Sequence, residues 1–95
     1  MKLAQIHINE KVVSAKAIAT YTKSSVTAIQ ILKGGLLKEH STPTPAMLVC
    51  VLGEVIYQDE TQNKVTLTPG DYFEIEPAVK HWLKGLANSQ LLLIK

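Results

Sequence analysis

Short apolar segments separated by turn residues follow one another from Val26 onward, and this succession limits the chain to very few folds. The expected strands are residues 26–33, 36–42, 46–52, 54–60, 64–67, 72–76, 81–86 and 90–95. Gly34 and Gly35 interrupt the first pair, and Thr68-Pro69-Gly70-Asp71 is a strong turn signal. Regularly spaced short strands with such turns are typical of a β-sandwich or barrel. We therefore predict an all-β fold, with any helix confined to the region before Val26.

The N-terminal quarter is less regular. Residues 3–8 are predicted to form a short strand. Residues 9–22 leave two alternatives open, because Asn9 suits the cap of a short helix whereas Val12, Val13 and Ile18 suit extended chain. We expect a single domain over residues 1–95, with its core in about 26–94 and an N-terminal strand or arm in 1–25.

Size and composition favour a compact domain in a reducing compartment. Ninety-five residues suit one domain, and 46% hydrophobic residues supply a core. The one cysteine, Cys50, excludes an intramolecular disulfide. The opening residues contain no apolar segment of signal-peptide length, and no apolar run approaches the roughly 20 residues of a membrane helix. These features predict a cytoplasmic location and no membrane partner.

The charged residues argue against a nucleic-acid partner. The net charge is +2, with ten lysines and no arginine. The lysines are scattered along the chain, and arginine is the usual residue for bidentate recognition of phosphates and base edges. We expect no nucleic-acid binding and interpret the lysines as a solvated surface.

Two of the predicted strand segments contain a histidine in a distinctive setting. His40 lies in "GGLLKEHSTPTPAMLVCVLGEV" and His81 in "PGDYFEIEPAVKHWL". Over residues 26–94 these segments resemble the two motifs of the small single-domain cupins. The matching positions are Gly34 or Gly35, His40 and Gly53 in the first motif, and Gly70, Asp71, Pro77 and His81 in the second. The resemblance implies a jelly-roll barrel, also called a double-stranded β-helix.

The same resemblance implies a degenerate metal site. Metal-binding cupins present three or four ligands, and this chain matches them at His40 and His81. The second histidine of the first motif falls on Thr42, and the glutamate falls on Ala46. Neither side chain is a normal ligand of first-row metals. We therefore expect a divalent metal (zinc, iron, nickel or manganese) to bind at low occupancy or not at all, through His40 and His81.

A ligand pocket is predicted inside the barrel, because side chains two residues apart on a strand share a face. Its expected lining is His40, Thr42, Leu48, Cys50, His81 and Leu83. Leu52 continues this face only if no bulge intervenes. Two buried imidazoles resist charging together. We predict that the neutral pair orients a small polar or anionic ligand.

Each residue also has a plainer interpretation. Cys50 could act as a nucleophile if a histidine lay beside it, but an isolated buried cysteine is usually a small hydrophobe. Thr42 is expected to bond a nearby backbone group, and His7 to be an ordinary strand residue. The carboxylates of Glu39, Glu74 and Glu76 are interpreted as solvated. No catalytic residue is assigned.

Three functions follow from these patterns. The first is a small-molecule-binding barrel with weak or absent metal binding. The alternative is a metal-dependent enzyme of dioxygenase or isomerase type that uses His40 and His81, so catalysis is left open. A sensor domain of a transcription regulator is a third, weaker interpretation. A homodimer is expected because residues 46–52 are apolar on both strand faces, and residues 3–8 are expected to cross to the partner.

Overall fold

The computed structural model describes residues 2–7 and 11–95. Nine strands and a single turn of 3-10 helix are present in this part of the chain. The helix is Leu3–Ile6, and the strands are β1 Val13–Thr20, β2 Ser25–Ile31, β3 Leu36–His40, β4 Ala46–Leu52, β5 Val55–Asp59, β6 Lys64–Leu67, β7 Tyr72–Ile75, β8 His81–Gly85 and β9 Ser89–Ile94. The predicted all-β fold is confirmed, and each strand expected from Val26 onward ends within two residues of its predicted bounds.

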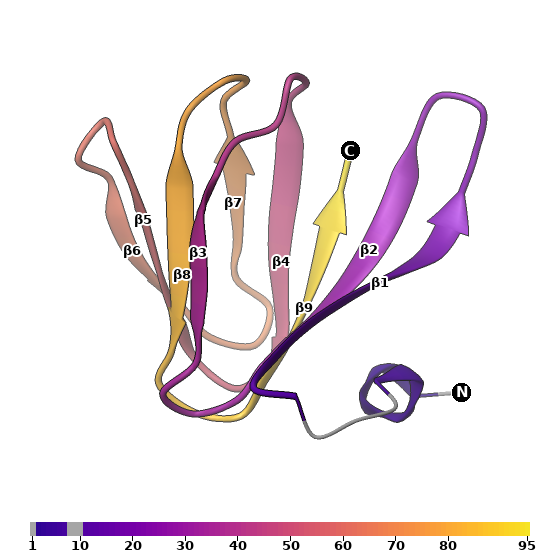
Figure 1. Ribbon diagram of the computed structural model, residues 1–95, viewed down its shortest axis with the longest axis vertical. Coiled ribbons are helices and arrows are strands. Elements are labelled where there is room, and N and C mark those ends of the chain that lie inside the picture. Colours follow the sequence, from indigo (N-terminus) through magenta and orange to yellow (C-terminus); the bar gives the residue numbers. More distant parts are fainter. Residues whose placement is uncertain (1, 8–10) are drawn as a thin grey trace.

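The strands form two antiparallel sheets that face each other (Figure 1). One sheet has the order β1-β2-β9-β4-β7 and the other the order β3-β8-β5-β6. The chain passes from one sheet to the other between β3 and β4, so neighbours in a sheet are often distant in sequence. This is a jelly-roll arrangement. The two sheets pack face to face without closing into one continuous barrel.

The core lies between the sheets and follows the period of two that the sequence predicts. In β4, Ala46, Leu48 and Cys50 are buried, whereas Met47 and Val49 between them are half-buried. The buried hydrophobic cluster also takes one side chain or more from most of the other strands: Ile29, Ile31, Val55, Tyr57, Leu67, Ile75, Leu83, Leu91 and Leu93.

The inward face of β4 ends at a bulge. The register between β4 and β9 shifts between Cys50 and Leu52, and Leu52 is 56% exposed instead of continuing the buried face. Gly53 follows with φ +89°, a left-handed conformation that favours glycine. A Cβ atom at Gly53 would also collide with the carbonyl oxygen of Asn88 and with Ser89. The turn therefore requires glycine here.

The prediction of a strand over residues 3–8 is wrong. Leu3–Ile6 form a 3-10 turn, in which the N–H of Gln5 donates to the carbonyl of Lys2 at 3.0 Å. The turn supplies this hydrogen bond locally, so no neighbouring strand is needed there. His7 follows the turn instead of lying in a strand, with its Nδ1 2.9 Å from the Ser14 hydroxyl. Ile8, and Asn9 as a helix cap, lie outside the described residues.

Residues 9–22 are predicted to be either a short helix or extended chain. Extended chain is correct for most of this region, because β1 covers Val13–Thr20. Figure 1 shows that the β1–β2 hairpin extends away from the rest of the molecule. β1 is the last strand of its sheet and pairs only with β2 among the described residues. Ile18 on this strand is 44% exposed. No helix in the described part of the chain is long and apolar enough to span a membrane.

Candidate functional site

The structure brings His40 and His81 together although 41 residues separate them in the sequence. They are direct partners across β3 and β8, and their ring centroids lie 4.1 Å apart with an interplanar angle of 60°. The His81 side chain is 1% exposed, whereas His40 is half-buried. The pair can therefore be reached from the His40 side.

Backbone carbonyls determine which nitrogen of each ring carries the proton. Nδ1 of His40 lies 3.0 Å from the carbonyl oxygen of Lys38, and Nδ1 of His81 lies 3.1 Å from that of Val79. A carbonyl oxygen can only accept, so Nδ1 must be the donor in both neutral rings. The two Nε2 atoms then keep their lone pairs. No hydrogen bond within residues 2–7 and 11–95 engages them. The pair thus presents two unused acceptor nitrogens.

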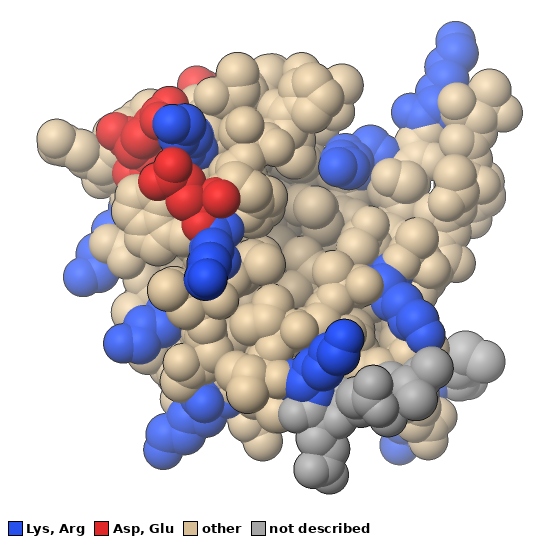
Figure 2. Space-filling model, viewed as in Figure 1, with Lys and Arg blue, Asp and Glu red and all other residues tan. Residues whose placement is uncertain are grey.

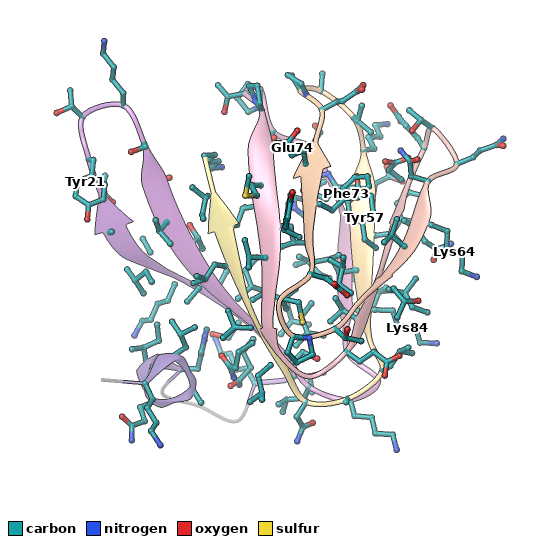
Figure 3. The ribbon with its side chains drawn as sticks, turned by 180° about the vertical axis from the view of Figure 1, so that it is seen from behind. Tyr21, Tyr57, Lys64, Phe73, Glu74 and Lys84 are labelled. Carbon is teal, nitrogen blue, oxygen red and sulfur yellow. The ribbon has the colours of Figure 1, made fainter. Side chains whose placement is uncertain are left out.

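Tyr57 and Asp59 support this pair, and the sequence analysis did not identify them. The Tyr57 ring stacks on His81 with centroids 5.8 Å apart and packs against Phe73 at 4.4 Å. Figure 3 shows Tyr57 and Phe73 side by side between the sheets. The Tyr57 hydroxyl donates to Oδ2 of Asp59 at 2.8 Å. The only sequence signal was their spacing of two residues, which places both on the inner face of β5.

Asp59 is a buried carboxylate with many hydrogen-bond donors. Besides Tyr57, it accepts from the backbone N–H and hydroxyl of Thr61 at 2.9 and 2.6 Å. It also accepts from the backbone N–H and side-chain amide of Asn63 at 3.2 and 3.0 Å. Burial alone raises the pKa of Asp59, but the hydrogen bonds from Thr61, Asn63 and Tyr57 outweigh burial and hold this pKa well below its usual range. Asp59 is therefore an anion that closes the β5–β6 turn.

The charge state of His81 depends on its burial and its neighbours. Burial and the adjacent His40 lower the pKa of His81, while the Val79 hydrogen bond and the charge of Asp59 act in the opposite direction. The net result is a pKa below the ordinary value. His81 is therefore neutral at pH 7, with Nε2 as an acceptor.

The remaining residues of the predicted pocket are placed as follows. Thr42 is buried, and its hydroxyl donates to the carbonyl of Thr44 at 2.8 Å, which is the local backbone bond expected for it. Leu48 and Leu83 are each 1% exposed and pack within the hydrophobic core. Thr42 therefore has no free hydroxyl hydrogen to offer a ligand in this conformation.

Cys50 is fully buried, which agrees with its interpretation as a small hydrophobic side chain. Its Sγ lies 3.7 Å from the carbonyl oxygen of Leu52, at the end of β4 remote from Ala46. Burial raises the pKa of the thiol, and the charge of Asp71 raises it further. No hydrogen bond links this sulfur to a histidine in the described part of the chain. The arrangement lacks the cationic neighbour that an activated cysteine needs.

The residues at the metal positions of the motif do not fit a metal cage. Ala46 is buried in the core, and the Thr42 hydroxyl is directed at the Thr44 backbone. No three or more His, Cys, Asp or Glu side chains cluster in a metal-binding arrangement within the described ranges 2–7 and 11–95. A stable cage usually takes three or four protein ligands. The two imidazoles are the whole donor set that the described residues bring together here.

Comparison with known proteins agrees with this architecture. No family model and no curated protein sequence matches the chain. Among solved structures, a cupin superfamily protein from Desulfitobacterium hafniense superimposes with a TM-score of 0.85 and 18% identity, over 98% of this chain and 84% of that one. A conserved protein of unknown function from Streptococcus pyogenes gives a TM-score of 0.82 and 20% identity, over 99% and 82% of the two chains.

A third similar structure is KdgF from Halomonas sp., with a TM-score of 0.78 and 20% identity over 90% of this chain and 80% of that one. At such identities the likeness concerns the fold. It agrees with the two jelly-roll sheets. The chain therefore has the fold of the small single-domain cupins.

Proposed function

We propose that this cupin domain binds a small molecule at the His40–His81 pair and holds metal weakly or not at all. The observation that supports the proposal is the pair of unused Nε2 atoms on adjacent rings, whose Nδ1–H groups are occupied by Lys38 and Val79. Neither Nε2 atom has a hydrogen-bond partner among the described residues, so a ligand that donates could bond both of them.

The tautomers also indicate the ligand's chemistry. Because each Nε2 is an acceptor, the ligand must donate, and a hydroxyl group suits this better than an anion. A small cavity of about 70 Å³ lies beside Asp59, Phe73 and Val79, and neither His40 nor His81 lines it. Its volume is that of about two water molecules. It can hold one or two ordered waters, whereas a ligand would meet the pair at the half-buried His40.

Substitution of either histidine is predicted to abolish binding while leaving the fold intact. The variants are His40→Ala, at a half-buried site, and His81→Phe, which keeps a ring against Tyr57. A thermal-shift screen of hydroxylated metabolites on the native chain identifies the ligand, and titration calorimetry on both variants should show no heat. His7→Ala is the matched control, because His7 contacts Ser14 instead of the pair.

Binding is also expected to weaken as the pH falls through the lowered pKa of His81, because protonation removes the Nε2 acceptor. Binding that is unchanged in both variants, or a screen in which no compound raises the melting temperature, would count against the pocket.

A metal-dependent cupin enzyme of dioxygenase or isomerase type is the second candidate. The observation that favours it is the same pair of Nε2 atoms, since imidazole is a preferred ligand of first-row metals. A third ligand would have to come from substrate or water. Metal analysis of protein purified without chelator separates the candidates: one equivalent per chain favours the enzyme, and near-zero metal favours the binding domain.

A second copy of the chain is the proposed partner, in a reducing compartment such as the cytoplasm. Support comes from β1, which is an edge strand among the described residues, with few charges and an exposed Ile18. Such edges readily pair with another strand, and two copies of β1 can pair antiparallel about a two-fold axis. The sequence expectation rested on residues 46–52, of which Met47 and Val49 are half-buried within one chain and Val51 is 41% exposed.

Sedimentation equilibrium at micromolar concentration is expected to show a dimer that Ile18→Lys converts to a monomer. A lysine on an edge strand opposes strand pairing because its charge would have to lie against the partner. Thr66→Lys, on the exposed side of the other sheet, is the control and should remain dimeric. A native chain that sediments only as a monomer would refute the proposed dimer.

A further inference from the structure

The turn between β7 and β8 contains a residue in a strained backbone conformation. Ala78 has φ +63°, a left-handed conformation that is uncommon for residues other than glycine. Pro77 precedes it in the turn. Proline followed by a residue of positive φ is the signature of a type II turn, in which the second of these positions is usually Gly or Asn. Ala78 is exposed, so the packing of its side chain does not explain the conformation.

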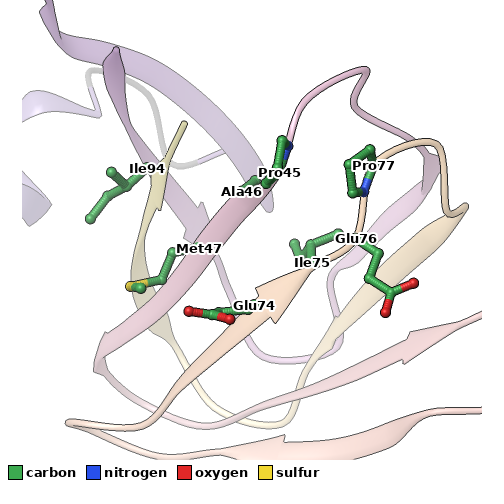
Figure 4. A pocket seen from close by; sticks show the side chains of 8 residues that line it. All are labelled: Pro45, Ala46, Met47, Glu74, Ile75, Glu76, Pro77 and Ile94. Carbon is green, nitrogen blue, oxygen red and sulfur yellow. The ribbon is translucent and has the colours of Figure 1, made fainter.

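A hydrogen bond holds Ala78 in this conformation. Its backbone N–H donates to the carbonyl oxygen of Thr42 at 2.7 Å. Figure 4 shows Pro77 at the turn and Pro45 before β4, at the same end of the sheet. Rotation of the peptide plane between Pro77 and Ala78 would relieve the positive φ, but it would also turn the N–H away from Thr42. Because Thr42 follows His40 closely, this bond joins the segment after His40 to the segment before His81.

The residue after Ala78 supplies the carbonyl that determines the tautomer of His81. The carbonyl oxygen of Val79 lies 3.1 Å from Nδ1 of His81. In a regular strand the carbonyl groups lie in the plane of the sheet, whereas side chains stand roughly perpendicular to it. A carbonyl two residues before a histidine can therefore reach its ring only where the backbone departs from the regular strand. The turn provides this departure before His81, and the register shift in β3 provides it before His40.

A second link between the same two segments is weaker. Lys80 and Glu39, each adjacent to one of the histidines in the sequence, form an ion pair at 3.7 Å with side chains that are 60% and 57% exposed. Figure 2 shows the acidic side chains of one face gathered in one area, with lysine atoms among them. Exposed ion pairs contribute little to stability. The hydrogen bond of Ala78 is therefore the stronger of these two links.

We propose that Ala78 is a positioning residue for the histidine pair. Its left-handed conformation, held by Thr42, places the Val79 carbonyl where it accepts from Nδ1 of His81, so that Nε2 of His81 stays an acceptor. A turn that only connected β7 to β8 would be more stable with glycine at this position. The inference rests on the proposed function, because a fixed acceptor nitrogen matters only where a ligand uses it.

The test compares Ala78→Val with Ala78→Asn. The two introduced side chains are similar in size, but a β-branched residue strongly disfavours a positive φ whereas Asn tolerates it. The nitrogen NMR shifts of the imidazole rings, measured without ligand at about pH 8 where His81 is neutral, report the tautomer. The native chain and Ala78→Asn should carry the proton of His81 on Nδ1, and Ala78→Val should show a mixture of both tautomers.

Hydrogen exchange gives a second, independent measurement of the turn. The backbone N–H at position 78 should exchange with solvent at least about tenfold faster in Ala78→Val than in the native chain, because its bond to Thr42 is broken for part of the time. Glu39→Gln is the matched control, since it removes the other link between the two segments. It should leave both the His81 tautomer and this exchange rate unchanged.

Three results would overturn the proposal. A lower melting temperature of Ala78→Val with an unchanged His81 tautomer would show a structural turn without a positioning role. Equal effects of Ala78→Val and Ala78→Asn would attribute the change to side-chain size, and a native His81 with its proton on Nε2 would contradict the assignment directly. If Ala78→Val does not fold, Ala78→Leu provides a milder change with the same expected direction. These measurements need no ligand, so a failed ligand search would refute the proposed function and leave the role of Ala78 standing.

Discussion

The double variant Thr42→His/Ala46→Glu is expected to bind nickel, zinc or iron at least about a thousandfold more tightly than the native chain. Structural zinc sites with four ligands contribute roughly 10–16 kcal/mol, or about 3 kcal/mol per ligand, so two added ligands should have a large effect. Both positions are buried, at 4% and 5% exposure, so the new side chains would be held inside the domain with His81. Competition titration with a chromophoric chelator measures the gain.

The single variant Thr42→His provides an intermediate step in this series. Adding His40→Ala to the double variant should remove most of the gain, because the new ligands need the existing imidazole pair. A native chain that already binds metal as tightly as the double variant would show that the count of two ligands is wrong. A thermal melt checks that the larger glutamate side chain introduced in place of Ala46 leaves the core folded.

Loss of the Asp59 carboxylate is predicted to be the most costly single change in the described part of the site. Asp59→Asn should lower the free energy of unfolding by about 2–4 kcal/mol, because hydrogen bonds to a charged group each contribute about 1.5–3 kcal/mol and an amide cannot accept all of them. Its donors are Tyr57, Thr61 and Asn63. Urea unfolding measures the loss. Asp71→Asn is the control and should have a smaller effect, since Asp71 is exposed and accepts only from Thr68.

The difference in the free energy of unfolding between the native chain and Asp59→Asn should become smaller as the pH falls. The folded-state pKa of Asp59 is below its unfolded value, so the unfolded state takes up the proton first as the pH falls. The contribution of Asp59 is fully present above about pH 5 and declines below the unfolded pKa of about 3.9 towards the folded pKa. The stability difference between native and Asp59→Asn should shrink from pH 6 to pH 3. A difference that is constant over this range would contradict the role of the charge.

Removal of the carboxylate is also expected to affect the histidine pair. The charge of Asp59 raises the pKa of His81, so Asp59→Asn should lower it further. Tyr57→Phe keeps the ring on His81 but removes the hydroxyl donor to Asp59. NMR titration of His81 in the two variants therefore distinguishes the charge of Asp59 from the packing of Tyr57.

The sequence predicted best those features that depend on neighbours along the chain. Alternation along β4 identified Ala46, Leu48 and Cys50 as inward residues, and the structure confirms their burial. At Leu52 the prediction held only if no bulge intervened, and the sequence could not decide this, because the bulge depends on pairing with β9, which is distant in sequence. The alternation rule failed at residues 3–8 for the related reason that an apolar alternation becomes a strand only beside a partner edge.

The sequence by itself determined the all-β fold, the inward faces of the strands and the presence of two histidines at matching motif positions. Only the tertiary structure decided which nitrogen of each histidine lacks a hydrogen bond. It also decided that the Tyr57 ring stacks on His81 while its hydroxyl donates to Asp59. The physical reason is that side-chain alternation is local, with a period of two residues. Hydrogen-bond partners and cross-strand neighbours are set by the register between segments that the sequence keeps far apart.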